Sequence, residues 1–205
     1  MKKHCDFRIR KNIIRWSIAV FAVLFVVLLI FSDSHLPDKK TSPAIMEMNR
    51  LYESELTALQ QRDAAYLEVF AGDESSEKKE NTSGTAELDI LCVTDSAISF
   101  AIRPKGEDVP FYGRDKYYNI DRNTGEHLDL MLVFGGAYRD IILDALIPKI
   151  AADEDVYEGF DVVPLIHENR PFYLTDGGSA VVIVFDRGEI APDNVGTKLY
   201  RVEKK

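Results

Sequence analysis

The hydrophobic and polar positions of the chain follow three patterns in turn: an unbroken apolar run, a helical period and a strand-like alternation. The run occupies residues 16–31, which carry no charge and a single polar side chain. A helix needs about 20 mostly apolar residues to cross a bilayer core of roughly 30 Å. Ile13 and Ile14 extend the run toward that length. We therefore predict a transmembrane helix at residues 13–31, with Ile13 and Phe31 at its ends.

The residues around this run indicate its orientation. Six basic side chains and one acidic side chain precede it, and an excess of positive charge stays on the cytoplasmic side of a membrane. We expect a cytoplasmic tail at residues 1–12, with the bulk of the chain outside the membrane. The alternative is a cleaved secretory signal, whose apolar stretch usually covers about 7–15 residues and ends at a small-x-small site. This run reaches or exceeds that length without such a site, which favours an uncleaved single-pass anchor.

The second pattern has a helical period. Residues 32–42 are polar, contain Pro37 and predict a linker. Ser42 has a typical N-cap identity and precedes a proline, which is favoured at the first helical position. Apolar side chains then recur with near-helical spacing, namely Ile45, Met48, Leu51, Tyr52, Leu56, Leu59, Tyr66, Leu67 and Phe70. With a stop at Gly72, this predicts an amphipathic helix at residues 43–72. A coiled-coil seam is the alternative, but the irregular spacing favours packing on the chain's own domain.

From residue 87 onward the apolar positions alternate as they do in strands. They predict a hairpin on either side of a turn at residues 94–96. Further strands are predicted at residues 116–120, 172–174, 180–185 and 198–202, and residues 127–134 could pair back as another. Residues 138–152 show one apolar helical face. This order of elements, joined by tight turns, predicts an α+β fold: an antiparallel sheet with helices packed on one face.

Charge and cysteine content narrow the class of partner. The first fifteen residues hold six basic and one acidic side chain, so the rest of the chain has a formal charge of −14, against −9 for the whole. An acidic outer part repels nucleic acid and favours basic partners. Cys5 and Cys92 fall on opposite sides of the predicted membrane. This excludes a disulfide between them, and with it the disulfide-stapled and zinc-cluster classes.

The chain carries few candidates for chemistry. Its four histidines, at positions 4, 35, 127 and 167, lack the paired spacing of metal ligands. Residues 121–125 resemble part of a calcium loop, but Leu132 stands where the loop needs glutamate, which favours a hairpin turn. We therefore predict no cofactor, no metal, no catalytic residue and no enzymatic activity. An envelope enzyme that uses Asp121, His127 or His167 is the alternative.

The loop at residues 103–114 is the best candidate for a binding segment. It is long and rich in proline, glycine and charge, and such loops often hold binding residues on a rigid scaffold. Phe111, Tyr112 and Arg114 are the candidate binding residues. The other interpretation is that the two aromatic side chains simply fix the loop to the sheet.

Three blocks in the C-terminal half resemble a known family. They are Tyr117-Tyr118-Asn119-Ile120-Asp121 followed by Asn123-Thr124-Gly125, then Phe172-Tyr173-Leu174-Thr175-Asp176-Gly177, then Glu189-Ile190-Ala191-Pro192 with Gly196. In this order they are similar to the domain of unknown function that ends the RsiV-type anti-sigma factors and accompanies some membrane-anchored peptidoglycan deacetylases. The resemblance covers residues 87–203. It implies a bacterial, extracytoplasmic, noncatalytic α+β domain, which in the anti-sigma factors binds lysozyme.

Two departures limit what this resemblance implies. Family members carry a Gly-Gly-x-His stretch before the Tyr-Asn-x-Asp block, whereas residues 103–113 here read RPKGEDVPFYG. An anti-sigma factor must also hold a sigma factor in the cytoplasm, and the short basic tail is too small to bury a specific interface of about 800 Å². A role in sequestering a sigma factor is therefore not expected.

These patterns lead to one expected function and two alternatives. We expect a membrane-anchored, extracytoplasmic, noncatalytic domain in a bacterial cell membrane that binds or senses a cell-envelope or protein ligand. Its partners would be the lipid bilayer and a basic protein such as lysozyme, or peptidoglycan fragments; nucleic acid is not expected. The alternatives are a structural subunit that docks on a larger envelope complex and, from another class, the cell-wall enzyme.

Overall fold

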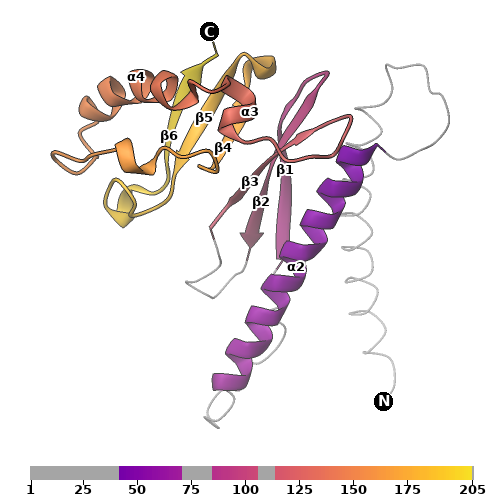
Figure 1. Ribbon diagram of the computed structural model, residues 1–205. Coiled ribbons are helices and arrows are strands. Elements are labelled where there is room, and N and C mark those ends of the chain that lie inside the picture. Colours follow the sequence, from indigo (N-terminus) through magenta and orange to yellow (C-terminus); the bar gives the residue numbers. More distant parts are fainter. Residues whose placement is uncertain (1–41, 71–84, 106–113, 205) are drawn as a thin grey trace, which may run out of the picture. The chain divides into compact units, whose positions relative to one another are not determined.

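The computed structural model describes residues 42–70, 85–105 and 114–204, the side chains of residues 63–70 excepted (Figure 1). All of these belong to one unit of the chain, Thr41–Lys205. The predicted tail and transmembrane helix, and all of the predicted linker before Ser42, lie outside the described residues. Among the helices that are described, none is long and apolar enough to cross a membrane.

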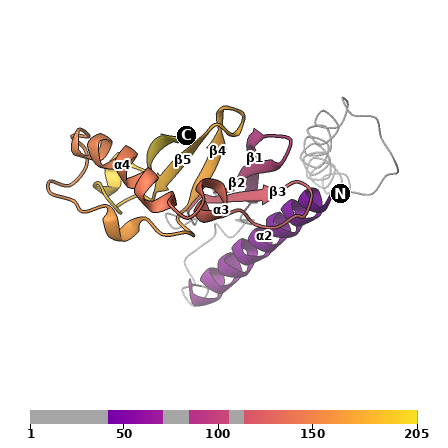
Figure 2. The same cartoon turned by 45° about the horizontal axis from the view of Figure 1, so that its top comes forward.

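The strands form two separate three-stranded antiparallel sheets, β1-β2-β3 and β4-β5-β6. The elements are α2 (Pro43–Phe70), β1 (Thr85–Val93), β2 (Ala97–Lys105), β3 (Lys116–Asp121), α3 (Leu130–Phe134), α4 (Tyr138–Ala151), β4 (Phe172–Thr175), β5 (Ala180–Phe185) and β6 (Lys198–Glu203), with short 3-10 turns at Val163–Leu165, Asp176–Gly178 and Asp193–Val195. The α+β class is confirmed, but the expectation of one sheet is wrong. Each sheet has its own helical cover, α2 on the first and α4 on the second (Figure 2).

Helix α2 packs its apolar face on the first sheet. The buried members of this core are Ala44, Met48, Leu51, Ile98, Phe100, Ile102 and Ile120, and burying one large aliphatic or aromatic side chain contributes about 1.5–3 kcal/mol. Ser42 does stand at the start of the helix, where its carbonyl accepts from the backbone N–H groups of Ile45 and Met46. Its hydroxyl donates to the Arg122 carbonyl at 3.1 Å. This bond ties the first turn of α2 to the turn after β3. The expected stop at Gly72 lies outside the described residues.

The second core lies between the β4-β5-β6 sheet and helices α3 and α4. All six side chains of β5 are buried, as expected of a central strand. On α4, Ile142, Leu146 and Ile150 are buried and recur every four residues, so they lie on one helical face. They pack with Val181, Ile183 and Phe185 of β5, which alternate along the strand.

The segment at residues 127–134 is not a strand. It makes one isolated bridge, between Ile120 and His127, and then forms helix α3. The Asp129 carboxylate accepts from the Leu132 N–H at 2.7 Å as the N-cap. Gly135 ends the helix with φ 80°, a conformation that favours glycine. A short apolar run between two such signals is ambiguous by periodicity alone, which explains the wrong prediction.

A buried polar junction joins the two sheets on the face of β2 and β3 opposite α2. The Ser99 hydroxyl donates to Asn119 Oδ1 at 2.5 Å, and Asn119 Nδ2 donates to the Phe172 carbonyl at 2.8 Å. The Leu174 N–H then donates to Ser99 Oγ at 3.0 Å. Ser99 and Asn119 are 0% and 4% exposed. Their side chains therefore provide hydrogen-bond partners for backbone groups on the edge of β4 that does not pair with β5. These bonds fix β4 against the first sheet.

Candidate functional site

A pocket of about 240 Å³ opens beside this junction. One wall is built by β3 and by residues 127–129, which follow its turn. The other wall is built by residues 168–172, which lead into β4. The lining residues are Tyr117, Tyr118, Asn119, His127, Leu128, Asp129, Glu168, Asn169, Arg170, Pro171 and Phe172.

Backbone and side-chain bonds hold the two walls together. Asn119 bonds to the Phe172 carbonyl across the junction. The Leu128 N–H donates to the Asn119 carbonyl at 2.8 Å, and the Leu130 N–H donates to the Glu168 carbonyl at 3.0 Å. The pocket therefore rests on a fixed backbone frame, which is the usual condition for a preformed binding site.

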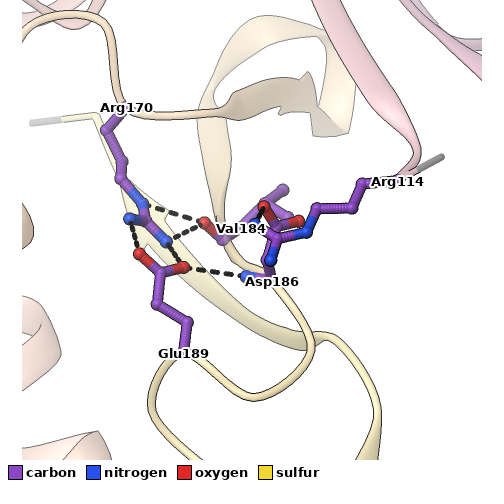
Figure 3. Close-up of polar contacts among 5 residues, drawn as sticks. All are labelled: Arg114, Arg170, Val184, Asp186 and Glu189. Atoms are coloured by element: carbon purple, nitrogen blue, oxygen red, sulfur yellow. Dashed lines mark hydrogen bonds and ion pairs between the residues drawn. The ribbon is translucent and has the colours of Figure 1, made fainter. Parts of the chain in front are cut away.

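Arg170 is 5% exposed, and each of its three guanidinium nitrogens donates to a group of the protein itself. Its Nε and Nη2 donate to the Val184 carbonyl, and Nη1 and Nη2 form a fork on the Glu189 carboxylate, with N–O distances of 2.5 Å (Figure 3). Its guanidinium carbon lies 4.2 Å from the Phe185 ring centroid. Glu189 Oε2 also accepts from the Asp186 N–H. Burial alone would raise the pKa of Glu189, but the hydrogen bonds and charge of Arg170 lower it.

Of the three binding candidates in the loop at residues 103–114, only Arg114 lies within the described residues. Its guanidinium pairs with Asp186 at 2.9 Å and stays 71% exposed (Figure 3). It does not line the pocket. Phe111 and Tyr112 lie outside the described residues, so their role stays a prediction.

The three titratable candidates are used in different ways. Asp121 Oδ1 accepts the backbone N–H groups of Asn123 and Thr124, as in a turn, and these bonds lower the pKa of Asp121. His127 lines the pocket, whereas His167 is exposed one residue outside its lining. The turn interpretation of residues 121–125 therefore agrees with the bonding.

The acidic stretch that follows α4 is also engaged. The Lys198 ammonium contacts both Asp153 and Asp155, and the Tyr200 hydroxyl donates to Asp153 at 2.6 Å. Among the described residues, no group of three histidine, cysteine, aspartate or glutamate side chains is arranged to hold a metal ion.

The pocket rim carries polar groups that the protein leaves open. Asp129 uses one carboxylate oxygen as the N-cap of α3. The Glu168 and Asn169 side chains are exposed, and within the described residues they make no hydrogen bond or ion pair. Because Glu189 already neutralises Arg170, the carboxylates of Asp129 and Glu168 make the rim negative. The pocket therefore suits a basic or hydroxyl-rich group better than an anion.

Sequence reasoning missed Asp129, Glu168 and Asn169. Asp129 did carry a readable signal, since it precedes an apolar run as an N-cap residue does. Glu168 and Asn169 stand in a polar stretch before a strand, which marks a loop but not a site. Their convergence with Asp129 depends on pairing between distant segments.

The rim histidine also contacts helix α2. His127 Nε2 lies 3.0 Å from Glu47 Oε1, and Arg50 forks on the same carboxylate. Hydrogen bonds from Arg50, and then from His127, lower the pKa of Glu47 from 4.5 to about 2. The contact links the pocket wall to the first described helix.

Glu47 predicts a pH dependence of stability. A carboxyl whose pKa is lowered on folding stabilises the fold fully above its unfolded pKa, and this contribution disappears as pH falls through the folded pKa. The stability difference between the parent and Glu47→Gln should therefore shrink as pH falls from 4.5 to 2. Urea denaturation across this range measures it. Glu53→Gln, at an exposed position of the same helix, is the control; equal pH profiles for both variants would contradict the contact.

No model of a known protein family matches the chain, and no curated protein matches it. Among solved structures, the crystal structure of a DUF3298 family member from Bacteroides fragilis is similar, with a TM-score of 0.46 and 16% sequence identity. The match covers 78% of this chain and 64% of that chain, so the chain spans less than two thirds of that protein's length. At this level of similarity the match does not place the chain in a family.

Proposed function

We propose that the chain is a membrane-anchored, extracytoplasmic, noncatalytic binding domain, and that the pocket between β3 and residues 168–172 receives a basic group of its ligand. The observation that carries this proposal is the pair of rim carboxylates, Asp129 and Glu168, beside an arginine that Glu189 already neutralises. The uncharged run at residues 16–31 and the resemblance to the RsiV-type domain support the location outside a bacterial membrane.

The lining can hold both parts of a long basic side chain. The half-buried Tyr117 offers ring surface to an aliphatic stem, while Asp129 and Glu168 attract the charged end. The formal charge of −14 beyond the basic tail favours the approach of a basic protein over distances of about a Debye length, roughly 8 Å. A basic protein such as lysozyme therefore fits this chemistry better than peptidoglycan fragments do.

Titration calorimetry of the full chain in lipid nanodiscs tests the proposal, with lysozyme and soluble peptidoglycan fragments as the two probes. We expect lysozyme to bind with a Kd of about 1 μM or tighter, equivalent to about −8 kcal/mol. Binding of the peptidoglycan fragments without binding of lysozyme would contradict a basic ligand and indicate a sugar ligand instead. No binding of either probe, repeated by a second method, would overturn the proposal.

Neutralising the rim should weaken this binding. We expect Asp129→Asn with Glu168→Gln to raise the Kd for lysozyme about tenfold, because exposed ion pairs contribute about 0.2–1 kcal/mol each. Asparagine keeps the cap of α3, so the fold should persist. The matched control is Asp144→Asn with Glu158→Gln, which removes two exposed carboxylates outside the pocket. An equal loss in both double variants would show that net charge, not the pocket, controls binding.

The proposed topology has its own test. A cysteine introduced at Lys78, on the proposed outer side of the membrane, should react with a membrane-impermeant thiol reagent on intact cells. Cys5 provides the internal comparison, since it precedes the predicted anchor. Labelling at position 78 only after the cells are opened would contradict an outward-facing domain.

A docking subunit is the second candidate function. Met131 and Leu132 of α3 are 44% and 63% exposed, and they stand two and three positions after Asp129 of the rim. Exposed apolar side chains beside a polar rim are common in protein interfaces. Stoichiometric co-purification of one integral membrane complex from detergent, without lysozyme binding, would favour this candidate.

A further inference from the structure

Two side chains of the pocket wall also hold helix α2. The Tyr118 hydroxyl donates to Glu55 Oε1 at 2.9 Å, and His127 Nε2 contacts Glu47 Oε1 at 3.0 Å. Both residues belong to the pocket lining, and their rings meet edge to face with centroids 6.1 Å apart. Each of these residues therefore lines the pocket and also contacts helix α2.

Glu47 and Glu55 lie on one face of α2. They are eight positions apart, with the buried Leu51 midway between them, and positions four apart are neighbours on a helix surface. Lys116 of β3 adds an ion pair to Glu55 at 2.7 Å. The apolar core fixes this face of the helix against the first sheet, and the polar contacts on either side depend on where Tyr118 and His127 stand.

We propose that occupation of the pocket and the docking of α2 on the first sheet are coupled. A group that fills the pocket displaces His127 and Tyr118 from Glu47 and Glu55, and α2 then loosens its first turns. Linkage makes the effect reciprocal, so loosening α2 must change the pocket. This coupling does not depend on the ligand of the proposed function, because any occupant of the pocket would produce it.

A side chain supplied from the opposite wall provides an occupant without any ligand. Asn169 is exposed and lines the pocket, and among the described side chains it makes no hydrogen bond to α2. In the full chain, Asn169→Trp should speed hydrogen exchange of the amides at residues 43–62 by about fivefold or more, the lower end of typical coupling. Asn194→Trp is the matched control, at an exposed position outside the pocket lining. If the indole lowers overall stability, Asn169→Tyr repeats the measurement with a smaller ring.

The reciprocal experiment changes the contacts of α2 and measures the effect in the pocket. The chain has one tryptophan, so Trp16→Phe with Asn169→Trp leaves a single indole as reporter in the pocket. Adding Glu47→Gln and Glu55→Gln should shift its fluorescence emission, whereas Glu53→Gln should not. Agreement with the control in either arm would overturn the coupling, because linkage is reciprocal. Neither arm uses an added ligand, so failure here leaves the calorimetric test of the proposed function standing.

Discussion

Arg170→Ala should lower the free energy of unfolding by about 3–5 kcal/mol, because removing one partner of a buried ion pair leaves the other uncompensated. The side chain is 5% exposed and bonds to Val184 and Glu189 at once. Its loss would leave the Val184 carbonyl and part of the Glu189 carboxylate without a donor. It would also remove the guanidinium from the Phe185 ring. Urea denaturation followed by circular dichroism measures the effect.

Arg187→Ala is the matched control for this substitution. Arg187 is exposed, and within the described residues it makes no hydrogen bond or ion pair. Its replacement should change stability by no more than about 0.5 kcal/mol. Equal, small effects for both arginines would contradict a stabilising role of the ion pair between Arg170 and Glu189.

Asn119→Ala should lower the free energy of unfolding by about 2–3 kcal/mol, since each buried polar group left unpaired costs about 1–3 kcal/mol. The substitution strips the Ser99 hydroxyl of its acceptor and the Phe172 carbonyl of its donor. Both groups lie at the junction where the two sheets meet. The same substitution should therefore weaken ligand binding, because the pocket walls lose the bond that joins them.

Asn123→Ala separates the junction from a general effect of losing an asparagine. Asn123 is exposed in the turn after β3, where its backbone N–H, not its side chain, makes the turn bond. We expect it to change stability by about 0.5 kcal/mol or less. Thermal and urea denaturation should show that Asn119→Ala is clearly less stable than Asn123→Ala. An Asn119 variant as stable as the Asn123 variant would contradict the junction.

Local periodicity was enough to predict most elements of the fold. The helical spacing after Ser42 predicts α2, and strict alternation predicts β1 and β2, because the buried face of each element must repeat with its own period. Residues 127–134 failed because a five-residue helix and a short strand present the same apolar run. In that segment the N-cap Asp129 and the terminal Gly135 carried the information.

The division into two sheets could not be predicted in this way. Pairing is set by contacts between distant segments, such as the bond from Leu174 to Ser99. The face of β2 that meets β4 does carry small residues, Ala97, Ser99 and Ala101, which let another strand approach closely. Small residues also occur on one face of many half-buried strands, so they do not predict the contact with β4 from the sequence alone.

The candidate site was harder to predict than the fold. His127 was named as a titratable group, but its neighbours on the rim, Glu168 and Asn169, come from a segment about forty positions away. The ion pair of Arg170 with Glu189 likewise has no local pattern. Of the loop candidates, the structure describes only Arg114, which lies outside the pocket lining.

Zero-length carbodiimide cross-linking of the full chain to lysozyme, followed by mass spectrometry, tests most directly whether the pocket receives a basic group. The reagent joins a carboxylate to an amine only when the two are in contact. We expect cross-links from Glu168 or Asp129 to lysine side chains of lysozyme, and we expect the Asp129→Asn, Glu168→Gln variant to lose them. Cross-links confined to carboxylates outside the pocket, such as Asp144 and Glu158, would contradict it.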